Sequence, residues 1–520
     1  MTRTNQTRHG WREITRMAQA QAHPHDHDVL DVIIIGSGIS GIGCAAHLRR
    51  DRPEKTWCIL EMRDDLGGTW DLFRYPGIRS DSDLYTFSYD FKPWNSDNAI
   101  AGAAEIKRYI AETADEYDIR RQIRFRRKVT ACAWDSTEGL WTVTTTRGDD
   151  GMVETWRGRW IFSATGYYDY DKGYRPAFPE EEKFAGPIIH PQHWPEDLDY
   201  TGKRIAVIGS GATAVTLLPA LAEKAAHVVQ VQRTPSYVMP MPQRDGLLTL
   251  ARLLPSRDLT HRLMRKKNIV QRHVFWLLCQ RYPKMMRALI RKINRANLPQ
   301  DFPIDIHFNP PYGPWQQRLC AVPEGDLYKS LSSGKTSIVT GHIDKFVADG
   351  IAMKSGEVVA ADIIVTATGL NLKMAGGVAY TVDGKPVVWS DHAIFRGMLL
   401  DGIPNFALCI GYTTSSWTLK VGLLCKYFCQ LLGEMDRRGK AICIPQRPAG
   451  GMTLKPLLDF GAGYVQRSIG SLPKQGDGYP WMMTFSYGGD VKMMKRSSVI
   501  LPEMKLYDAP AAPAHRPAPA

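Results

Sequence analysis

Residues 31–41 read Asp-Val-Ile-Ile-Ile-Gly-Ser-Gly-Ile-Ser-Gly, and they decide the fold of the first part of the chain. The apolar run over 31–35 has the length of a buried parallel strand, and a G-x-G-x-x-G pattern follows it at once. The first glycine permits a tight turn, the second lets a pyrophosphate approach the backbone, and the third lets a helix, expected over 43–50, pack on the strand. The stretch therefore predicts a dinucleotide-binding unit.

The next expected strand, over 56–60, ends in a carboxylate. In a unit of this kind an acid at that place binds the ribose diol of the ligand. The predicted contacts of the first cofactor are Gly36, Gly38, Ser40, Gly41 and Glu61.

The same arrangement returns in the middle of the chain. An expected strand over 204–208 is followed by G-x-G-x-x-A at 209–214, a helical stretch over 215–226 and a strand over 227–232. This last strand ends in Arg233 and Thr234, a cation and a hydroxyl suited to a 2′-phosphate, which favours NADP over NAD. The predicted contacts of the second cofactor are Gly209, Ser210, Gly211, Ala212, Thr213, Ala214, Val215, Arg233 and Thr234.

One acidic and one basic dinucleotide site imply FAD and NADPH on a single chain of the α/β class, with two Rossmann-like domains. Two Ala-Thr-Gly turns, at 164–166 and 367–369, each end an apolar strand and suit crossings between the two domains. Residues 124–130 and 140–146 alternate in polarity, which predicts an antiparallel meander between the first unit and the first turn.

Composition bounds the remaining possibilities. The chain has 520 residues, 44% hydrophobic and 23% charged, which excludes a single small module and wholesale disorder. No apolar run has the roughly 18 residues of a membrane span. Nine scattered cysteines without a C-x-x-C pair favour a reducing cytoplasm. His23, His25 and His27 alternate in a polar tract, but we assign no metal site to them.

Net charge is +13, and its location matters more than its size. Residues 252–295 contain thirteen Lys and Arg against one acid, Asp258. No nucleic-acid-binding motif occurs there, so we expect no nucleic-acid partner. This basic segment belongs to an expected helical insertion. It is read either as a cap with a solvated basic face or as an amphipathic helix on a membrane surface.

Residues 184–195, FAGPIIHPQHWP, match F-x-G-x-x-x-H-x-x-x-W-P and resemble the fingerprint of Baeyer–Villiger monooxygenases. Related flavin-containing and N-hydroxylating monooxygenases end this pattern differently. The resemblance covers roughly residues 28–500. Stretches such as 67–83 and 208–217 are most similar to the mycobacterial, ethionamide-activating subgroup of the family.

The resemblance implies further site residues. Thr69, Trp70, Asp71 and Leu72 correspond to the loop along the flavin, and Asp81 and Val129 also fall among the FAD contacts. Arg79 and Ser80 correspond to the segment between flavin and nicotinamide, on the NADP side. In WQQRLC (315–320), Arg318 stands where the family has its active-site arginine, and Asp81 would hold it. His190 is read as a hinge residue between the domains rather than as a general base.

By the same resemblance the chain would be an NADPH- and O2-dependent FAD monooxygenase that converts ketones to esters or lactones and also oxidises sulfur. The alternatives are an N- or S-hydroxylating enzyme, a flavin disulfide reductase and a non-enzymatic nucleotide-binding protein. Substrate identity and oligomeric state stay open. The expected organisation is a flexible arm (1–29), an FAD domain (30–160 and 370–500), an NADP domain (161–245 and 325–369), a helical insertion (246–324) and a flexible tail (501–520).

Overall fold

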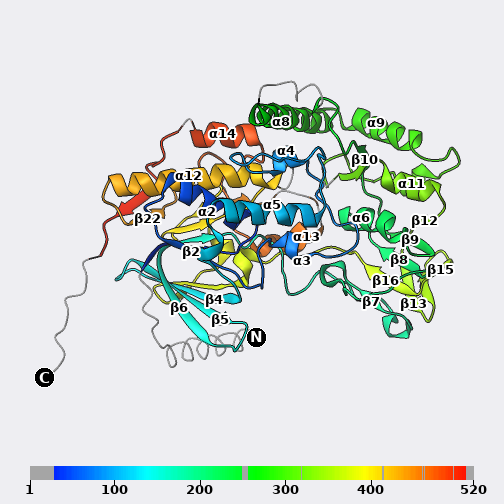
Figure 1. Ribbon diagram of the computed structural model, residues 1–520, viewed down its shortest axis with the longest axis horizontal. Helices are drawn as coiled ribbons and strands as arrows, with labels where there is room; N and C mark the ends of the chain where they lie inside the picture. The colour runs from blue at the N-terminus through cyan, green and yellow to red at the C-terminus, as the bar shows by residue number, and fades with distance from the viewer. Residues whose placement is uncertain are drawn as a thin grey trace.

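The computed structural model describes residues 29–248, 256–317, 319–412, 415–458, 461, 463–495 and 497–510. Two sheet-centred halves lie side by side, and helices α8 (Arg257–Arg281) and α9 (Pro283–Ala296) run along one edge of the molecule (Figure 1). The predicted α/β class is confirmed. Arg318, residues 1–28 of the expected arm and residues 511–520 of the expected tail lie outside the described residues.

The first half is built on a nine-stranded sheet in which parallel and antiparallel strands meet. Its order is β18-β17-β4-β5-β6-β1-β2-β3, and β21 pairs with β6. Strands β2, β1, β6 and β21 run parallel, whereas β4, β5 and β6 form the antiparallel meander. The strands are β1 (Leu30–Ile35), β2 (Trp57–Leu60), β3 (Ile123–Arg124), β4 (Arg127–Asp135), β5 (Leu140–Arg147), β6 (Val153–Ser163), β17 (Ala379–Val382), β18 (Lys385–Pro386) and β21 (Phe406–Leu408).

Strand β1 is buried on both faces. Val32 and Ile34 belong to a core cluster with residues of α2 (Ile39–Asp51), α5 (Ala103–Glu116) and α12 (Trp417–Arg437). Ile33 and Ile35 point the other way and pack with residues of the meander such as Trp141. Burial on two faces is the reason for the continuous apolar run in this part of the sequence.

The expected strand over 124–130 is divided in two. Ile123–Arg124 forms β3, which pairs in parallel with β2, and the meander strand β4 begins only at Arg127. Between them Arg126 adopts a φ of 56°, so the chain turns through the left-handed region. The prediction was wrong here because arginine gives no local turn signal.

The second half contains a fully parallel five-stranded sheet of order β12-β9-β8-β16-β7. Its edge strand β7 comes from the middle of the 184–195 fingerprint. Phe184 packs on Phe346, and a Cβ at Gly186 would lie 2.2 Å from the Asp362 carbonyl oxygen, so both fingerprint residues have packing roles. The strands are β7 (Ile188–Ile189), β8 (Arg204–Ile208), β9 (His227–Gln232), β12 (Thr336–Thr340) and β16 (Ile363–Thr366), with helices α6 (Ala212–Leu221) and α11 (Asp326–Ser332) beside them.

The insertion is not entirely helical. Strand β11 (Cys320–Pro323) lies within the expected range 246–324 and pairs in parallel with β10 (Val238–Met241). These two strands bracket the segment that contains α8 and α9, so the insertion leaves and rejoins the second half at one place.

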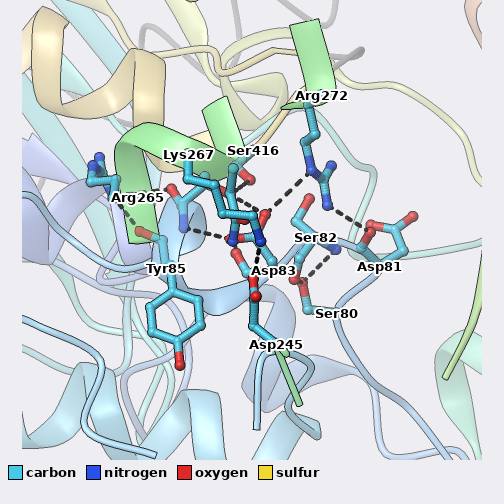
Figure 2. Close-up of polar contacts among 12 residues, drawn as sticks. Ser80, Asp81, Ser82, Asp83, Tyr85, Asp245, Arg265, Lys267, Arg272 and Ser416 are labelled. Atoms are coloured by element: carbon cyan, nitrogen blue, oxygen red, sulfur yellow. Dashed lines mark hydrogen bonds and ion pairs between the residues drawn. The ribbon is translucent and has the colours of Figure 1, made fainter. Parts of the chain in front are cut away.

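Helix α8 turns basic side chains inward, which contradicts an interpretation in which its basic face is simply solvated. Arg265 donates to the carbonyl oxygens of Tyr85 and Ser88, each at 2.9 Å. Arg272 Nε lies 3.3 Å from Asp83 Oδ2, and Lys267 pairs with Asp245 (Figure 2). The expectation was wrong for these three cations, which bind carbonyl groups and acids of the protein, whereas Arg262, Lys266, Lys284 and Lys292 are exposed as expected.

The expected tail also begins too early. Residues Met504–Tyr507 form β25, antiparallel to β22 (Ile442–Pro445), and Met504 is buried in the core of the first half. The remaining elements named below or completing the fold are α3 (Thr69–Leu72), α4 (Leu84–Phe87), α10 (Ile304–His307), α13 (Gly463–Ser468), α14 (Tyr487–Lys495), β13 (Ile343–Val347), β14 (Gly350–Met353), β15 (Val358–Ala360), β19 (Ile394–Phe395), β20 (Leu399–Leu400), β23 (Lys455–Pro456) and β24 (Lys474–Gln475).

Candidate active site

The parallel strands of both halves point their carboxyl ends at one cavity of about 1310 Å³. Ile35 and Leu60, at the ends of β1 and β2, line it from one side, and Ile208 and Val231, near the ends of β8 and β9, line it from the other. Open α/β sheets bind ligands at this edge. The volume exceeds the roughly 300–1,000 Å³ of an ordinary small-molecule site, so it suits two extended ligands.

The first glycine loop needs its glycines for different reasons. Gly36 adopts a φ of 100°, and a Cβ there would lie 2.9 Å from the Ala164 carbonyl oxygen. A Cβ at Gly41 would lie 1.9 Å from the Gly36 carbonyl oxygen, so this glycine allows α2 to pack on β1. Helix α2 therefore begins at Ile39, earlier than predicted, and its N-terminus with Gly38 and Ser40 borders the cavity, where backbone N–H groups favour an anion.

The second glycine loop repeats this construction. Gly209 adopts a φ of 147°, and a Cβ there would lie 2.3 Å from the Ala367 carbonyl oxygen. Around Gly211 a Cβ would meet no atom within 4 Å, which leaves its backbone open to the cavity. Ala164 and Ala367 open the two Ala-Thr-Gly turns, so each turn closes the back of one glycine loop.

The two loops differ in the charge beside them. Glu61 is buried after β2, and its Oε2 accepts from Ser37 N (2.7 Å) and Ser37 Oγ (2.8 Å). Arg233 is exposed after β9 and has no hydrogen bond or ion pair within the described part of the chain. Both residues line the cavity. A carboxylate fixed by hydrogen bonds therefore lies beside the first loop, and a guanidinium without a partner in the described residues lies beside the second.

The loop over 67–72 divides between the cavity and the protein interior. Thr69 and Trp70 line the cavity, and a Cβ at Gly68 would lie 3.0 Å from Gly38 Cα. The Asp71 carboxylate is buried away from the cavity and accepts from Arg63 Nε (2.7 Å) and Lys107 Nζ (2.6 Å). Leu72 packs into the core of the second half. The side chains of these last two residues are therefore structural.

The segment over 79–83 joins three parts of the molecule. Arg79 pairs with Asp326 of α11, with Nη2 3.3 Å from Oδ1, and so links the two halves. Ser80 Oγ donates to the Ser82 carbonyl oxygen at 2.9 Å, and Arg272 of α8 donates to the Asp81 carbonyl oxygen at 3.4 Å (Figure 2). Arg79, Ser80 and Asp81 all line the cavity.

Arg318 is not among the described residues, so its contact with Asp81 stays a prediction. On either side of it, Gln317 and Cys320 line the cavity.

His190 lies outside the cavity, between the fingerprint and the second Ala-Thr-Gly turn. Its Nδ1 accepts from Gln192 N at 3.2 Å, so its Nε2 carries a proton that it donates to the Gly369 carbonyl oxygen at 3.1 Å. Burial lowers the pKa of this imidazole below its usual value, which favours the neutral ring. These contacts fit a hinge residue, which remains a prediction.

Aromatic side chains on the cavity wall were missed from the sequence. Trp417 stacks on Tyr167 with ring centroids 5.2 Å apart, and its Nε1 donates to Ser40 Oγ at 2.9 Å. Burial raises the pKa of Tyr170 to about 12, so its hydroxyl stays protonated. The available signal was the Tyr pair directly after the first Ala-Thr-Gly turn.

The structure brings most of the predicted contact residues to this one cavity. Those that line it are Gly36, Gly38, Ser40, Glu61, Thr69, Trp70, Arg79, Ser80, Asp81, Val129, Gly209, Ser210, Gly211, Ala212, Thr213, Arg233 and Thr234. Those that do not are Gly41, Asp71, Leu72, Ala214 and Val215. Ala214 and Val215 are buried in α6 against the second sheet.

Residues 30–288 match the family described as "Flavin-binding monooxygenase-like". The chain is 46% identical over 472 residues to "FAD-containing monooxygenase EthA" of Mycobacterium tuberculosis, covering 90% of this chain and 96% of the relative. It is 43% identical over 470 residues to "Probable FAD-binding monooxygenase AlmA" of Acinetobacter baylyi, covering 90% of this chain and 94% of the relative.

Among solved structures, the fold is similar to "Oxidized steroid monooxygenase bound to NADP", with a TM-score of 0.70 and 22% identity over 92% of this chain and all of that one. At this identity the likeness concerns the fold alone. The expected cofactors, FAD and NADP, are those that the names of these similar proteins contain. By its family match and its 46% identity to a relative of nearly equal length, the chain belongs to the flavin-binding monooxygenase-like family.

Proposed function

We propose that this chain is an NADPH- and O2-dependent FAD monooxygenase of the Baeyer–Villiger type, which inserts oxygen next to the carbonyl carbon of a ketone to form an ester or lactone. The observation that carries the proposal is one cavity bordered by two glycine loops, the first beside the buried Glu61 and the second beside the available Arg233. The 184–195 fingerprint supports the reaction type. The same enzyme would also oxidise sulfur in thioamides and sulfides, for which the oxygen donor acts as an electrophile.

FAD fits the first loop. The open N-terminus of α2 offers backbone donors to a pyrophosphate, and Glu61 can accept from ribose hydroxyls while Ser37 holds its carboxylate in place. Thr69, Trp70 and Val129 would border the flavin ring from the cavity wall. When bound, FAD would accept a hydride from NADPH and activate O2.

NADPH fits the second loop. The uncrowded backbone at Gly211 allows a pyrophosphate to approach the N-terminus of α6. Arg233 and Thr234 would bind the 2′-phosphate, which NADH lacks. This charge beside the second loop is the basis for preferring NADPH.

During oxygen insertion, negative charge develops on oxygen atoms, and a fixed cation beside them would stabilise that charge. Arg318 would supply it, since a guanidinium stays protonated at any working pH. Asp81, on the wall of the same cavity, would orient Arg318 as a positioning residue. The stacked rings of Tyr167 and Trp417 line the same cavity and would help to exclude water from it.

The runner-up is an N- or S-hydroxylating monooxygenase on the same fold. The Trp-Pro ending of the fingerprint argues against it. A disulfide reductase needs a redox-active cysteine pair beside the flavin, whereas all nine cysteines are buried and none forms a disulfide.

A cytoplasmic location and the absence of a nucleic-acid partner also remain proposals. In the described ranges, no helix is long and apolar enough to cross a membrane. Arg265, Lys267 and Arg272 of the basic segment are engaged within the molecule, which leaves fewer cations for phosphate contacts than the sequence suggested.

The test is product analysis with purified, FAD-loaded enzyme, NADPH, and a panel of linear and cyclic ketones alongside methyl phenyl sulfide. Ester or lactone should form from at least one ketone and should disappear in Arg318→Ala. Arg318→Lys should recover little, because it lacks the planar fork. Sulfoxide or N-oxide products with no ester from any ketone would favour the runner-up. Ester formation at near wild-type rate in Arg318→Ala would mean that another cation acts.

A further inference from the structure

Exposed apolar side chains are concentrated on α8, α9 and the turn between them. Of the seventeen large hydrophobic side chains that are exposed in the described part of the chain, eight lie within residues 257–296, each 44–55% exposed. Soluble proteins rarely gather such residues without a partner. The eight are Leu259, Leu263, Val270, Val274, Leu277, Tyr282, Met285 and Leu289.

On α8 these residues form one stripe. Leu263, Val270, Val274 and Leu277 follow one another in steps of seven, four and three residues, which places them on one face of an α-helix. Met285 and Leu289 share a face of α9 in the same way, and the two helices contact each other. Both run along the outer edge of the molecule (Figure 1).

The opposite face of α8 is the one that packs on the protein, and it is largely polar, although Met264 and Cys279 are also buried there. Asn268 Nδ2 donates to Asp83 Oδ1 at 2.9 Å, and His261 Nε2 lies 2.9 Å from Ser88 Oγ. Arg265 and Arg272 bind the same segment (Figure 2). An ordinary surface helix buries its apolar face, whereas α8 packs mainly through polar and charged side chains and exposes an apolar stripe. The outward stripe is therefore not needed for packing α8 on the protein.

Unengaged cations lie beside the stripe. Lys266 adjoins it on α8, and Lys284 and Lys292 adjoin Met285 and Leu289 on α9. Throughout the part of the chain that the structure describes, these three lysines have no ion pair. The one acid of this surface, Asp258, is paired with Arg262 at 2.6 Å.

We propose that the outer face of α8 and α9, the eight exposed apolar residues with Lys266, Lys284 and Lys292, docks on an anionic phospholipid bilayer. An apolar stripe flanked by lysines is the pattern of a helix that lies in the plane of a membrane interface, with the apolar side chains among the acyl chains and the cations at the headgroups. A second copy of this chain fits less well, because a two-fold contact through this face would oppose like charges.

The proposal goes beyond the proposed function and does not depend on the reaction type. It also has a structural consequence. The inner face of α8 holds Asp81 and Asp83, and Ser80, Asp81 and Ser82 line the cavity, so the docked helix is one layer away from the cavity wall.

The experiment measures binding of the full-length, FAD-loaded protein to sedimented vesicles of phosphatidylcholine with phosphatidylglycerol at a 70:30 ratio, and to vesicles of phosphatidylcholine alone. One variant replaces the stripe (Val270→Gln, Val274→Gln, Leu277→Gln), since glutamine keeps the helix propensity. A second replaces the cations (Lys266→Gln, Lys284→Gln, Lys292→Gln). The matched control, Val358→Gln with Val388→Gln, removes apolar side chains of 54% and 51% exposure far from this surface in the sequence.

The wild type and the control should bind the anionic vesicles, with affinity that falls as NaCl rises. Each triple variant should bind at least tenfold more weakly, and the lysine variant should also lose most of the salt dependence. Equal binding of all four proteins would overturn the proposal. So would the absence of vesicle binding together with a dimer, seen by sedimentation velocity, that the stripe variant abolishes, because the partner would then be a second copy.

Discussion

Replacing Arg233 by alanine should separate the two nicotinamide nucleotides. Arg233 is exposed on the cavity wall and makes no contact that folding requires, so its removal changes the site and leaves stability intact. A charge-assisted hydrogen bond contributes about 1.5–3 kcal/mol. At about 1.4 kcal/mol per factor of ten, the KM for NADPH should rise roughly 10- to 150-fold. The KM for NADH should change less than about threefold, because NADH has no 2′-phosphate for Arg233 to bind.

The assay is steady-state oxidation of both nucleotides at saturating ketone. Lys335→Ala is the matched control, because Lys335 is an exposed cation at the far end of the same sheet, one residue before β12. It should leave both KM values unchanged. If Arg233→Ala raised the two KM values in parallel, or left that for NADPH unchanged, the assignment of the second loop to NADPH would be refuted.

Three further changes test particular contacts. Burial lowers the pKa of His261 from 6.5 to about 4. As the pH falls below 6.5, the unfolded chain therefore takes up a proton that the folded protein does not yet bind. About 3 kcal/mol of the free energy of unfolding present above pH 6.5 should be lost by pH 4. Urea unfolding of His261→Gln, which cannot titrate, should lack this part of the loss, and superimposable pH profiles would contradict it. Lys420→Met leaves the fully buried Asp490 carboxylate without its cation and should lower the free energy of unfolding by about 3–5 kcal/mol. The double variant Lys420→Met with Asp490→Asn should recover a large share of this loss. If it recovers none, the ion pair is not the reason for the loss. Glu61→Ala should purify with less FAD per protein, and full FAD content would contradict the ribose contact.

The glycine loops could be predicted because their requirements are local. At Gly36 and Gly209 the backbone itself needs a positive φ, and at Gly41 a side chain would collide with the preceding turn of the same unit. All of these reasons are contained within a dozen residues of sequence. The role of the Ala-Thr-Gly turns was less accessible, because Ala164 and Ala367 meet their glycine loops from more than 100 residues away.

For Asp71, the contact expected from the family resemblance differs from the contacts in the structure. Its place in the flavin loop suggested a cofactor contact, yet its carboxylate is buried between Arg63 and Lys107. An acid with Arg63, Lys107 and, at 3.7 Å, Arg74 within reach is more stable there than facing a cofactor phosphate of its own sign. Arg74 is near Asp71 in the sequence, but nothing in the spacing of Arg63 and Lys107 brings those two cations to this carboxylate. Long-range charge pairing of this kind is set by the packing of α5 on the loop.

The orientation of α8 rests on the same kind of competition. A surface helix ordinarily packs its apolar stripe against the protein. The surface that α8 meets is largely polar, however, since beside the small apolar contact of Met264 with Tyr85 it presents the Tyr85 and Ser88 carbonyl groups and the Asp83 carboxylate. Leaving those groups buried without donors would cost more than exposing a stripe of leucine and valine. The polar face therefore packs against the protein, and the apolar stripe stays exposed on the outer side of α8, where it can bind an apolar partner such as the acyl region of a bilayer.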